Sequence, residues 1–304
     1  MILMYYQGKI TELWPAIDAH ISQMLGQPFN SVTHIPVGGG CINAAYHISG
    51  GGRDCLVKIN VPERHAMFAA EAAGLQEILA SGAIRAPAPI CHGSAAHASY
   101  LVLEFLAMDA CSGHACEQLA RQLASMHAHT ASQFGWRINN TIGATPQSNT
   151  FHDDWISFWR EERLEFQFRL ASRNGINDSL QKKGACLLTR IEQFFPGYAP
   201  SPSLLHGDLW NGNCGVLEQG EPVVFDPAVY YGDRETDLAM SELFGGFPAR
   251  FYAAYREAYP LDPGYEVRKT LYNLYHVLNH ANLFGGSYAG QAERMLDQLL
   301  SEVR

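Results

Sequence analysis

Residues 204–227, LLHGDLWNGNCGVLEQGEPVVFDP, are the stretch of sequence that is most informative about the fold, because polar side chains follow short apolar runs in it. Asp208 is followed by Asn213 five positions later and by Asp226 eighteen positions later. The apolar runs before these carboxylates read as short buried strands, so both acids are expected at strand ends facing a cleft. One carboxylate can accept the proton of an attacking hydroxyl, while an amide oxygen and a second carboxylate hold Mg²⁺ on a triphosphate. The segment predicts phosphoryl transfer, and two unrelated acids in a surface hairpin are the alternative.

The composition predicts a globular protein with a substantial core, because 47% of its 304 residues are hydrophobic. The N-terminus lacks a basic leader and a small-residue cleavage site, and the sequence has no run of eighteen apolar residues. Seven cysteines make an odd count without a C-x-x-C pair, which is typical of reduced thiols. We therefore expect a cytoplasmic protein without a membrane segment.

The formal net charge of −9 argues against nucleic acid as a partner, since phosphate backbones require clustered Lys and Arg. A negative protein also repels the triphosphate of ATP, so an ATP site in this chain needs positive charge close to the phosphates. Positive charge for the phosphates must come from Mg²⁺, a buried lysine and backbone N–H groups.

The first hundred residues predict a strand meander with a glycine loop at its first turn. Residues 32–37, 44–48 and 55–59 read as strands, and Gly38, Gly39 and Gly40 interrupt the first two. Glycines let a backbone approach phosphates closely and direct N–H groups at them. An ordinary hairpin turn is the alternative for this triplet.

Lys58 lies between apolar residues of the third predicted strand, where its side chain should be buried. A buried ammonium group needs a partner of opposite charge. Glu71 lies in the apolar stripe of the following helix, four residues from both Met67 and Leu75. The two residues are therefore predicted to pair, the alternative being two exposed charges.

Two further strands, at residues 90–93 and 100–106, complete a five-stranded antiparallel lobe, and a helix over residues 11–25 is expected to cover it. From residue 108 the hydrophobic period becomes helical. We predict an α+β chain of two lobes, residues 1–107 and residues 108–304. The larger lobe should contain helices over residues 117–129, from Asp153 or Asp154 to Arg173, and over residues 180–195, 250–259, 265–284 and 292–300.

The order His206-Gly207-Asp208, then Asn213, then Asp226 resembles the catalytic and metal-binding loops of the protein-kinase-like superfamily. The glycine after the histidine resembles the small-molecule kinase branch. The longer strings HGDLWNGN and, over residues 225–247, FDPAVYYGDRETDLAMSELFGGF are very similar to the fructosamine kinases, also called ketosamine-3-kinases. This resemblance covers nearly the whole chain and implies a bilobal protein-kinase-like fold, with a helix C beside the sheet of the small lobe.

The resemblance implies roles for the polar residues of both lobes. Asp208 would be the catalytic base, Asn213 and Asp226 would hold Mg²⁺, and Lys58 with Glu71 would orient the α- and β-phosphates of ATP. Between the lobes, Leu103 would be the gatekeeper, and the carbonyl of Glu104 and the N–H of Leu106 would face adenine. Asp237 would accept hydrogen bonds from backbone N–H groups of the catalytic loop.

For three further residues the sequence suggests a role less directly. Trp210 could offer a ring face to the sugar, and His280 could reach the sugar pocket, although packing explains both residues equally well. Cys41 follows the glycine triplet, where N–H groups that attract anions could favour a thiolate. We interpret it as an oxidation-sensitive position of the nucleotide loop, the alternative being a small residue that fits there.

The activity implied by the resemblance is ATP-dependent phosphorylation of the sugar O3 of ketosamines, which are sugar adducts of amines such as protein lysines. This step destabilises the adduct and lets the amine be recovered. Two other classes stay open, namely a kinase of aminoglycosides or choline and a catalytically silent binding module with a kinase fold. A silent module would be expected to have lost Lys58, Asp208, Asn213 or Asp226, and all four are present. We expect a monomer, with a dimer as the alternative.

Overall fold

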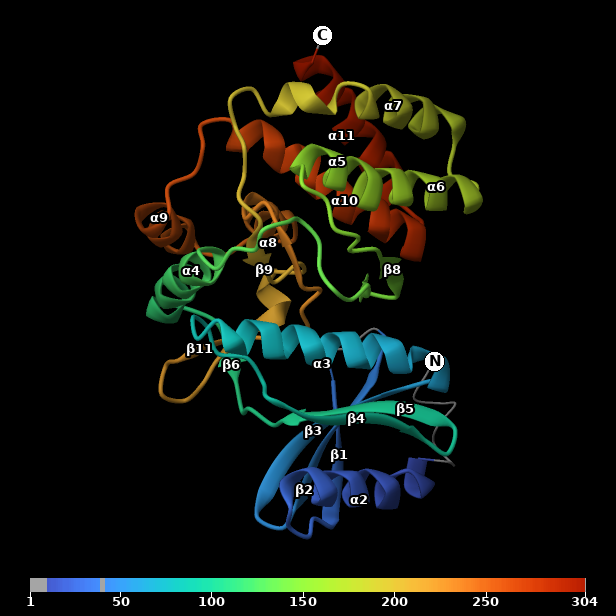
Figure 1. Ribbon diagram of the computed structural model, residues 1–304, viewed down its shortest axis with the longest axis vertical. Helices are drawn as coiled ribbons and strands as arrows, with labels where there is room; N and C mark the ends of the chain where they lie inside the picture. The colour runs from blue at the N-terminus through green and yellow to red at the C-terminus, as the bar shows by residue number, and fades with distance from the viewer. Residues whose placement is uncertain (1–9, 39–41, 304) are drawn as a thin grey trace.

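A computed structural model describes residues 10–38 and 42–303 of the chain (Figure 1). Its small lobe is built on a five-stranded antiparallel sheet in the order β1-β2-β3-β5-β4. The strands are β1 (Ser31–Val37), β2 (Ala44–Gly50), β3 (Arg53–Asn60), β4 (Pro89–Ala95) and β5 (Ala98–Glu104). The predicted sheet is confirmed, with strands that extend one or two residues beyond most of the expected limits.

The two faces of this sheet are covered by different helices, α2 (Trp14–Leu25) and α3 (His65–Ala80), which lie on opposite sides of the strands in Figure 1. Alternate residues of β3 therefore face different cores. Val57 packs in a cluster with residues of α2, whereas Leu101 and Leu103 of β5 pack with residues of α3. Lys58 pairs with Leu101 across the ladder and so lies on the α3 face of the sheet.

The large lobe is mainly helical. Its α-helices are α4 (His114–His127), α5 (Trp155–Phe158), α6 (Phe166–Arg173), α7 (Asp178–Leu188), α8 (Glu235–Leu243), α9 (Ala249–Ala258), α10 (Tyr265–Phe284) and α11 (Tyr288–Glu302). Asp154 caps α5 by accepting a 2.7 Å hydrogen bond from the backbone N–H of Ser157. The helix predicted to run from this cap to Arg173 contains a π-helical segment, η3 (Trp159–Glu165). The helix predicted over residues 180–195 ends early, at Leu188, and a short 3₁₀ turn, η4 (Ile191–Phe194), follows.

Short strands fix the loops that carry the polar residues of the large lobe. β9 (Ser203–Leu205) pairs with β12 (Tyr230–Gly232), and β10 (Cys214–Val216) pairs with both β11 (Pro222–Val224) and β6 (Asp109–Ala110). A 3₁₀ turn, η5 (Asn211–Asn213), enters β10. A separate hairpin consists of β7 (Asn140–Ile142) and β8 (Thr145–Gln147). The two lobes also meet through the backbone, because the N–H of Val224 donates to the carbonyl of Arg85 at 3.0 Å.

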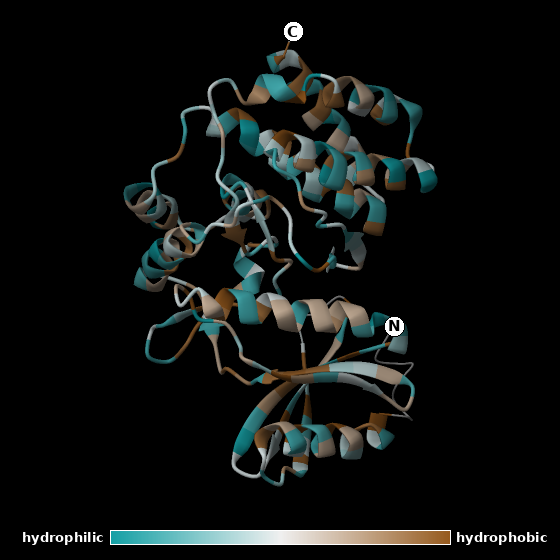
Figure 2. Ribbon diagram, viewed as in Figure 1, coloured by the Kyte–Doolittle hydropathy of each residue, from teal (hydrophilic) through white to brown (hydrophobic). Residues whose placement is uncertain are grey.

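Figure 2 shows hydrophobic and hydrophilic residues alternating along the helices of the large lobe, as expected of amphipathic helices with one packed face. Within residues 10–38 and 42–303, no helix combines the length and the apolar character needed to span a membrane.

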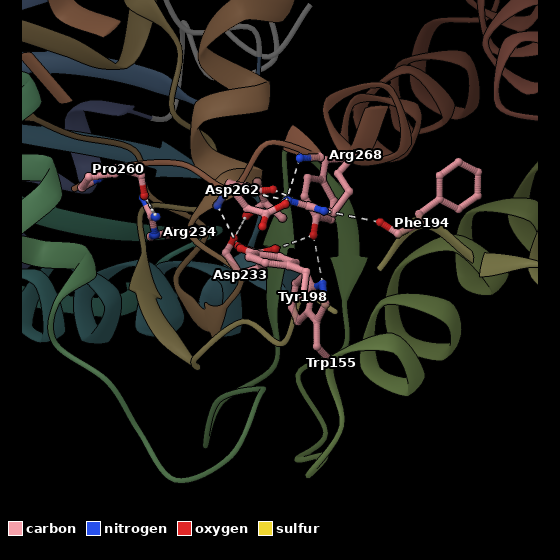
Figure 3. Close-up of polar contacts among 12 residues, drawn as sticks. Trp155, Phe194, Tyr198, Asp233, Arg234, Pro260, Asp262 and Arg268 are labelled. Carbon is pink, nitrogen blue, oxygen red and sulfur yellow. Dashed lines mark hydrogen bonds and ion pairs between the residues drawn. The ribbon is translucent and has the colours of Figure 1, made fainter. Parts of the chain in front are cut away.

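A buried polar network holds α8 against α10 (Figure 3). Arg268 of α10 is 1% exposed and binds both carboxylate oxygens of Glu235, at 2.8 and 3.1 Å, and Asp262 at 2.7 Å. Beside this pair, Asp233 accepts hydrogen bonds from Tyr198 at 2.9 Å and Tyr272 at 2.5 Å. Burial raises the pKa of Glu235 to about 7, although the hydrogen bonds from Arg268 oppose the rise.

We expect Arg268→Met to lower the free energy of unfolding by about 3–5 kcal/mol, because the substitution leaves a buried carboxylate without its cation. Arg256→Met is the matched control, since Arg256 pairs with Glu266 at 3.8 Å on the surface, where both side chains are about half exposed or more. That variant should stay within about 1 kcal/mol of the wild type. Urea denaturation of the three proteins measures both effects, and equal stability of all three would show that the network is dispensable.

Candidate active site

One buried ammonium group joins the two lobes. Lys58 of β3 donates to Glu71 of α3 at 2.5 Å and also forms an ion pair with Asp226 of the large lobe. Burial alone would lower the pKa of Lys58, but the two carboxylates outweigh it and raise that pKa, so the ammonium stays charged. The pair with Glu71 was expected from the sequence, whereas the contact with Asp226 was not.

Asp226 is held in an unusual backbone conformation. Its φ is +57°, a left-handed value that side-chain-bearing residues adopt rarely and that Asp tolerates better than most. The neighbouring backbone supports this conformation, because the N–H of Phe225 donates to the carbonyl of Asn213 at 3.0 Å and the N–H of Ala228 donates to that of His206 at 2.9 Å. Strained backbone supported in this way is typical of functional positions.

Asp208 lies beside this cluster and is tied to Asn213. The Asn213 amide nitrogen donates to the backbone carbonyl of Asp208 at 2.8 Å and to its carboxylate at 3.2 Å. Burial, reinforced by the negative charge of Asp226, raises the pKa of Asp208 to about 7, although the hydrogen bond from Asn213 opposes the rise. A carboxylate with this pKa is suited to take up a proton near neutral pH.

The residues predicted to hold Mg²⁺ have the chemistry that this ion needs. Asn213 uses its amide nitrogen toward Asp208, which reserves its side-chain oxygen as a ligand, and the Asp226 side chain is 46% exposed. Within residues 10–38 and 42–303, no group of three or more His, Cys, Asp or Glu side chains could hold a metal alone. Mg²⁺ is commonly bound by one or two protein oxygens together with phosphates and water, and the oxygens of Asn213 and Asp226 fit that mode of binding.

The loop before Asp208 is held by Asp237 of α8. Its carboxylate accepts hydrogen bonds from the backbone N–H groups of His206, at 2.7 Å, and Gly207, at 2.8 Å, so the contact expected for Asp237 is present. The ring of His127 lies 3.1 Å from the same carboxylate. Burial acts to raise the pKa of Asp237, but its contacts with His127, His206 and the N–H of Gly207 together keep that pKa below its ordinary value. The sequence around His127 carries no signal for this contact.

Gly207 is required for the close approach of the two loops that carry Asp208 and Asp226. Its φ is +81°, and a Cβ atom added there would lie 2.1 Å from the carbonyl oxygen of Ala228. No other residue fits this position without moving the backbone, which explains the glycine in His206-Gly207-Asp208.

In the connection between the lobes, the side chain of Glu104 is engaged in an ion pair. The carboxylate of Glu104 pairs with Arg85 at 2.5 Å, and the buried Leu103 packs in the core beneath α3. Leu106 follows the end of β5 and is partly exposed. Of the glycine triplet, Gly38 is exposed, whereas Gly39, Gly40 and Cys41 lie outside the described residues.

The two residues considered for the sugar are linked by an aromatic side chain that the sequence did not single out. Phe244 lies edge-on to Trp210, with ring centroids 6.5 Å apart, and 4.8 Å from His280. Trp210 is 37% exposed and covers Gly212, where an added Cβ would lie 2.3 Å from the indole. The signal for Phe244 was present in the sequence as the first residue of FGGF at residues 244–247.

Comparison with known proteins agrees with this geometry. Residues 13–302 match the model of the fructosamine kinase family. A probable ketoamine kinase of Synechocystis sp. is 49% identical over 94% of this chain and 97% of its own length. The chloroplastic protein-ribulosamine 3-kinase of Arabidopsis thaliana is 42% identical over 88% of this chain and 82% of its own length.

Solved structures agree as well. The crystal structure of a candidate fructosamine-3-kinase of Haemophilus somnus is 28% identical, with a TM-score of 0.87 over 94% of this chain and 97% of the other. An aminoglycoside phosphotransferase shares the fold at 15% identity and a TM-score of 0.63. The chain therefore belongs to the fructosamine kinase family.

Proposed function

We propose that the protein transfers the γ-phosphate of ATP to O3 of the sugar in ketosamines. The observation that carries this proposal is the complete set of Lys58, Glu71, Asp208, Asn213 and Asp226 at the junction of the lobes, in a chain of the fructosamine kinase family. A binding module without activity would have no need of all five residues. An aminoglycoside phosphotransferase shares the fold, whereas the WNGN and FGGF strings of this chain resemble the fructosamine kinases and favour a ketosamine as the acceptor.

Each residue of this set has a role in the reaction. Lys58, fixed by Glu71, binds the α- and β-phosphates, and the backbone of Glu104 and Leu106 receives the adenine. Asp208 accepts the proton of the sugar hydroxyl as that oxygen attacks the γ-phosphate. Asn213 and Asp226 hold Mg²⁺, which when bound neutralises charge on the phosphates. Asp237 keeps the catalytic loop in place.

The acceptor binds beside the aromatic residues Trp210, Phe244 and His280. Aromatic rings can pack against a sugar and can also attract the protonated amine of a ketosamine. Burial lowers the pKa of His280, so its ring stays neutral and does not repel that amine. The acidic protein, with a net charge of −9, also favours a cationic acceptor.

The cysteines support the proposed cellular setting. All six cysteines of the described residues are free thiols, and even the neighbouring sulfurs of Cys111 and Cys116, 3.4 Å apart, are not bonded. We place the protein in the cytoplasm as a monomer that acts on free or protein-bound lysine adducts. The oxidation sensitivity of Cys41 stays a prediction.

A panel of acceptors tests the activity. Purified enzyme with ATP and Mg²⁺ should release ADP with ribulosyl-lysine or fructosyl-lysine, free or within a glycated protein. Kanamycin and choline serve as controls for related kinases, and lysine alone serves as the control for the amine. Turnover limited to kanamycin or choline would contradict the proposal.

Asp208→Asn should reduce kcat roughly 100-fold or more, because it keeps the shape of the side chain and removes its basicity. Binding of ATP should persist, which calorimetric titration with a non-hydrolysable ATP analogue measures. Near-normal turnover by this variant would eliminate Asp208 as the base.

Glu71→Gln should lower kcat/KM for ATP about 10- to 100-fold. The neutral amide can still accept a hydrogen bond, but Lys58 would then pair chiefly with Asp226 and be drawn away from the phosphates. Glu77→Gln is a control on the same helix, because Glu77 contacts Tyr231 at 2.9 Å and not Lys58. Steady-state kinetics at varied ATP concentrations compares the variants. An equal decrease of kcat/KM in both variants would contradict a specific role of Glu71.

A further inference from the structure

The hairpin of β7 and β8 lies against the segment that carries Asp226. Its two ends contribute buried amide side chains, Asn140 at 9% exposure and Gln147 at 2%. Asn140 donates to the carbonyl of Val229 at 2.8 Å, and Gln147 donates to that of Ala228 at 3.3 Å. Two successive carbonyls after Asp226 are thus held by one hairpin.

The two amides are themselves oriented. Gln147 donates to the side-chain oxygen of Asn140 at 2.8 Å and accepts the hydroxyl of Tyr275 at 2.6 Å. Asn149 also donates to the oxygen of Asn140, at 3.1 Å. Such a connected network leaves each amide one orientation, with its nitrogen directed at the carbonyls.

The same segment is bounded on its other sides. An added Cβ on Gly74 of α3 would lie 3.1 Å from the side chain of Val229, so the small lobe packs directly on this residue. On the side of the catalytic loop, Ala228 donates to His206. The left-handed conformation of Asp226 therefore sits at the start of a segment held from three directions.

The tip of the hairpin reaches the small lobe. Arg64 donates to the carbonyl of Ala144 at 3.1 Å. An added Cβ on Gly143 would lie 3.3 Å from the side chain of Ile42, which follows the glycine loop in sequence. The hairpin therefore contacts both lobes as well as the Asp226 segment.

We propose that Gln147 and Asn140 are positioning residues for the metal ligand Asp226. This assignment rests on the proposed function. In it, the hairpin fixes the peptide units that follow Asp226. The carboxylate is then presented to Mg²⁺ in one direction instead of several. Loss of these contacts should weaken binding of Mg²⁺ more than binding of the nucleotide itself.

The test compares Gln147→Met with Thr145→Val. Methionine matches the length of glutamine and removes its hydrogen bonds. Thr145 belongs to the same hairpin and is equally buried, but its hydroxyl has no partner, so valine should change little. Mn²⁺ binding in the presence of a non-hydrolysable ATP analogue is followed by electron paramagnetic resonance, and Mg²⁺ dependence of kcat is measured in parallel.

Gln147→Met should raise the Kd for Mn²⁺ and the half-saturating Mg²⁺ concentration about tenfold, the effect of losing one or two buried hydrogen bonds. Affinity for the analogue without metal should stay within about twofold of the wild type, as should all values for Thr145→Val. Unchanged metal affinity in Gln147→Met would overturn the proposal. So would an equal loss of metal-free nucleotide affinity, which indicates general disruption.

If Gln147→Met does not fold, Asn140→Ala carries the same test through the carbonyl of Val229, with the same outcomes. The metal titration contains no ketosamine. A wrong assignment of the acceptor would therefore leave its result unchanged, and failure of the two proposals can be told apart.

Discussion

The ammonium group of Lys58 forms ion pairs with carboxylates of both lobes, and the geometry of the site depends on these pairs. It is buried, and its charge is supported by Glu71 from the small lobe and Asp226 from the large lobe. Removing an unpaired ammonium from water costs several kcal/mol, so Glu71 compensates the charge within the small lobe and Asp226 adds a second partner from the large lobe. One cation between two carboxylates leaves one negative charge, which is the electrostatic condition for binding a further cation at Asp226.

The rest of the large lobe keeps the loops at this junction in place. Asp237 fixes the backbone before Asp208, and it projects from α8, which the Arg268–Glu235 pair holds against α10. The hairpin of residues 140–147 supports the backbone after Asp226 from the opposite side. Asp208 and Asp226 therefore sit on separately anchored loops. This arrangement allows Asp208 to keep a raised pKa while Asp226 stays paired with Lys58.

Much of this site could be predicted from the sequence, because several of its residues are charged at positions where the hydrophobic pattern predicts a buried apolar side chain. Lys58 and Glu71 each interrupt an apolar pattern, and a buried charge requires a partner, so their pairing follows from elementary physics. The sheet was predictable from segments in which apolar and polar residues alternate and from the glycine-rich turns between them. The contact of Asp237 and the adenine-facing roles of Glu104 and Leu106 were expected instead from the resemblance to kinases.

Other contacts have no local signal. Lys58 and Asp226 are separated by 168 positions, and only the folded chain brings them together. Asn140 and Gln147 lie in three-residue strands among polar residues, a pattern that also suits an exposed turn. Phe244 stands in the FGGF string, but its contact with Trp210 depends on the packing of separate loops.

The proposed activity places the phosphate on O3 of the sugar in a ketosamine. The most direct measurement is ¹H–³¹P correlation NMR of the product that the enzyme forms from ribulosyl-lysine and ATP. The account predicts a single phosphate ester whose phosphorus couples to the proton on C3 of the sugar. Coupling to the protons of a different carbon, or no phosphorylated ketosamine at all, would contradict it.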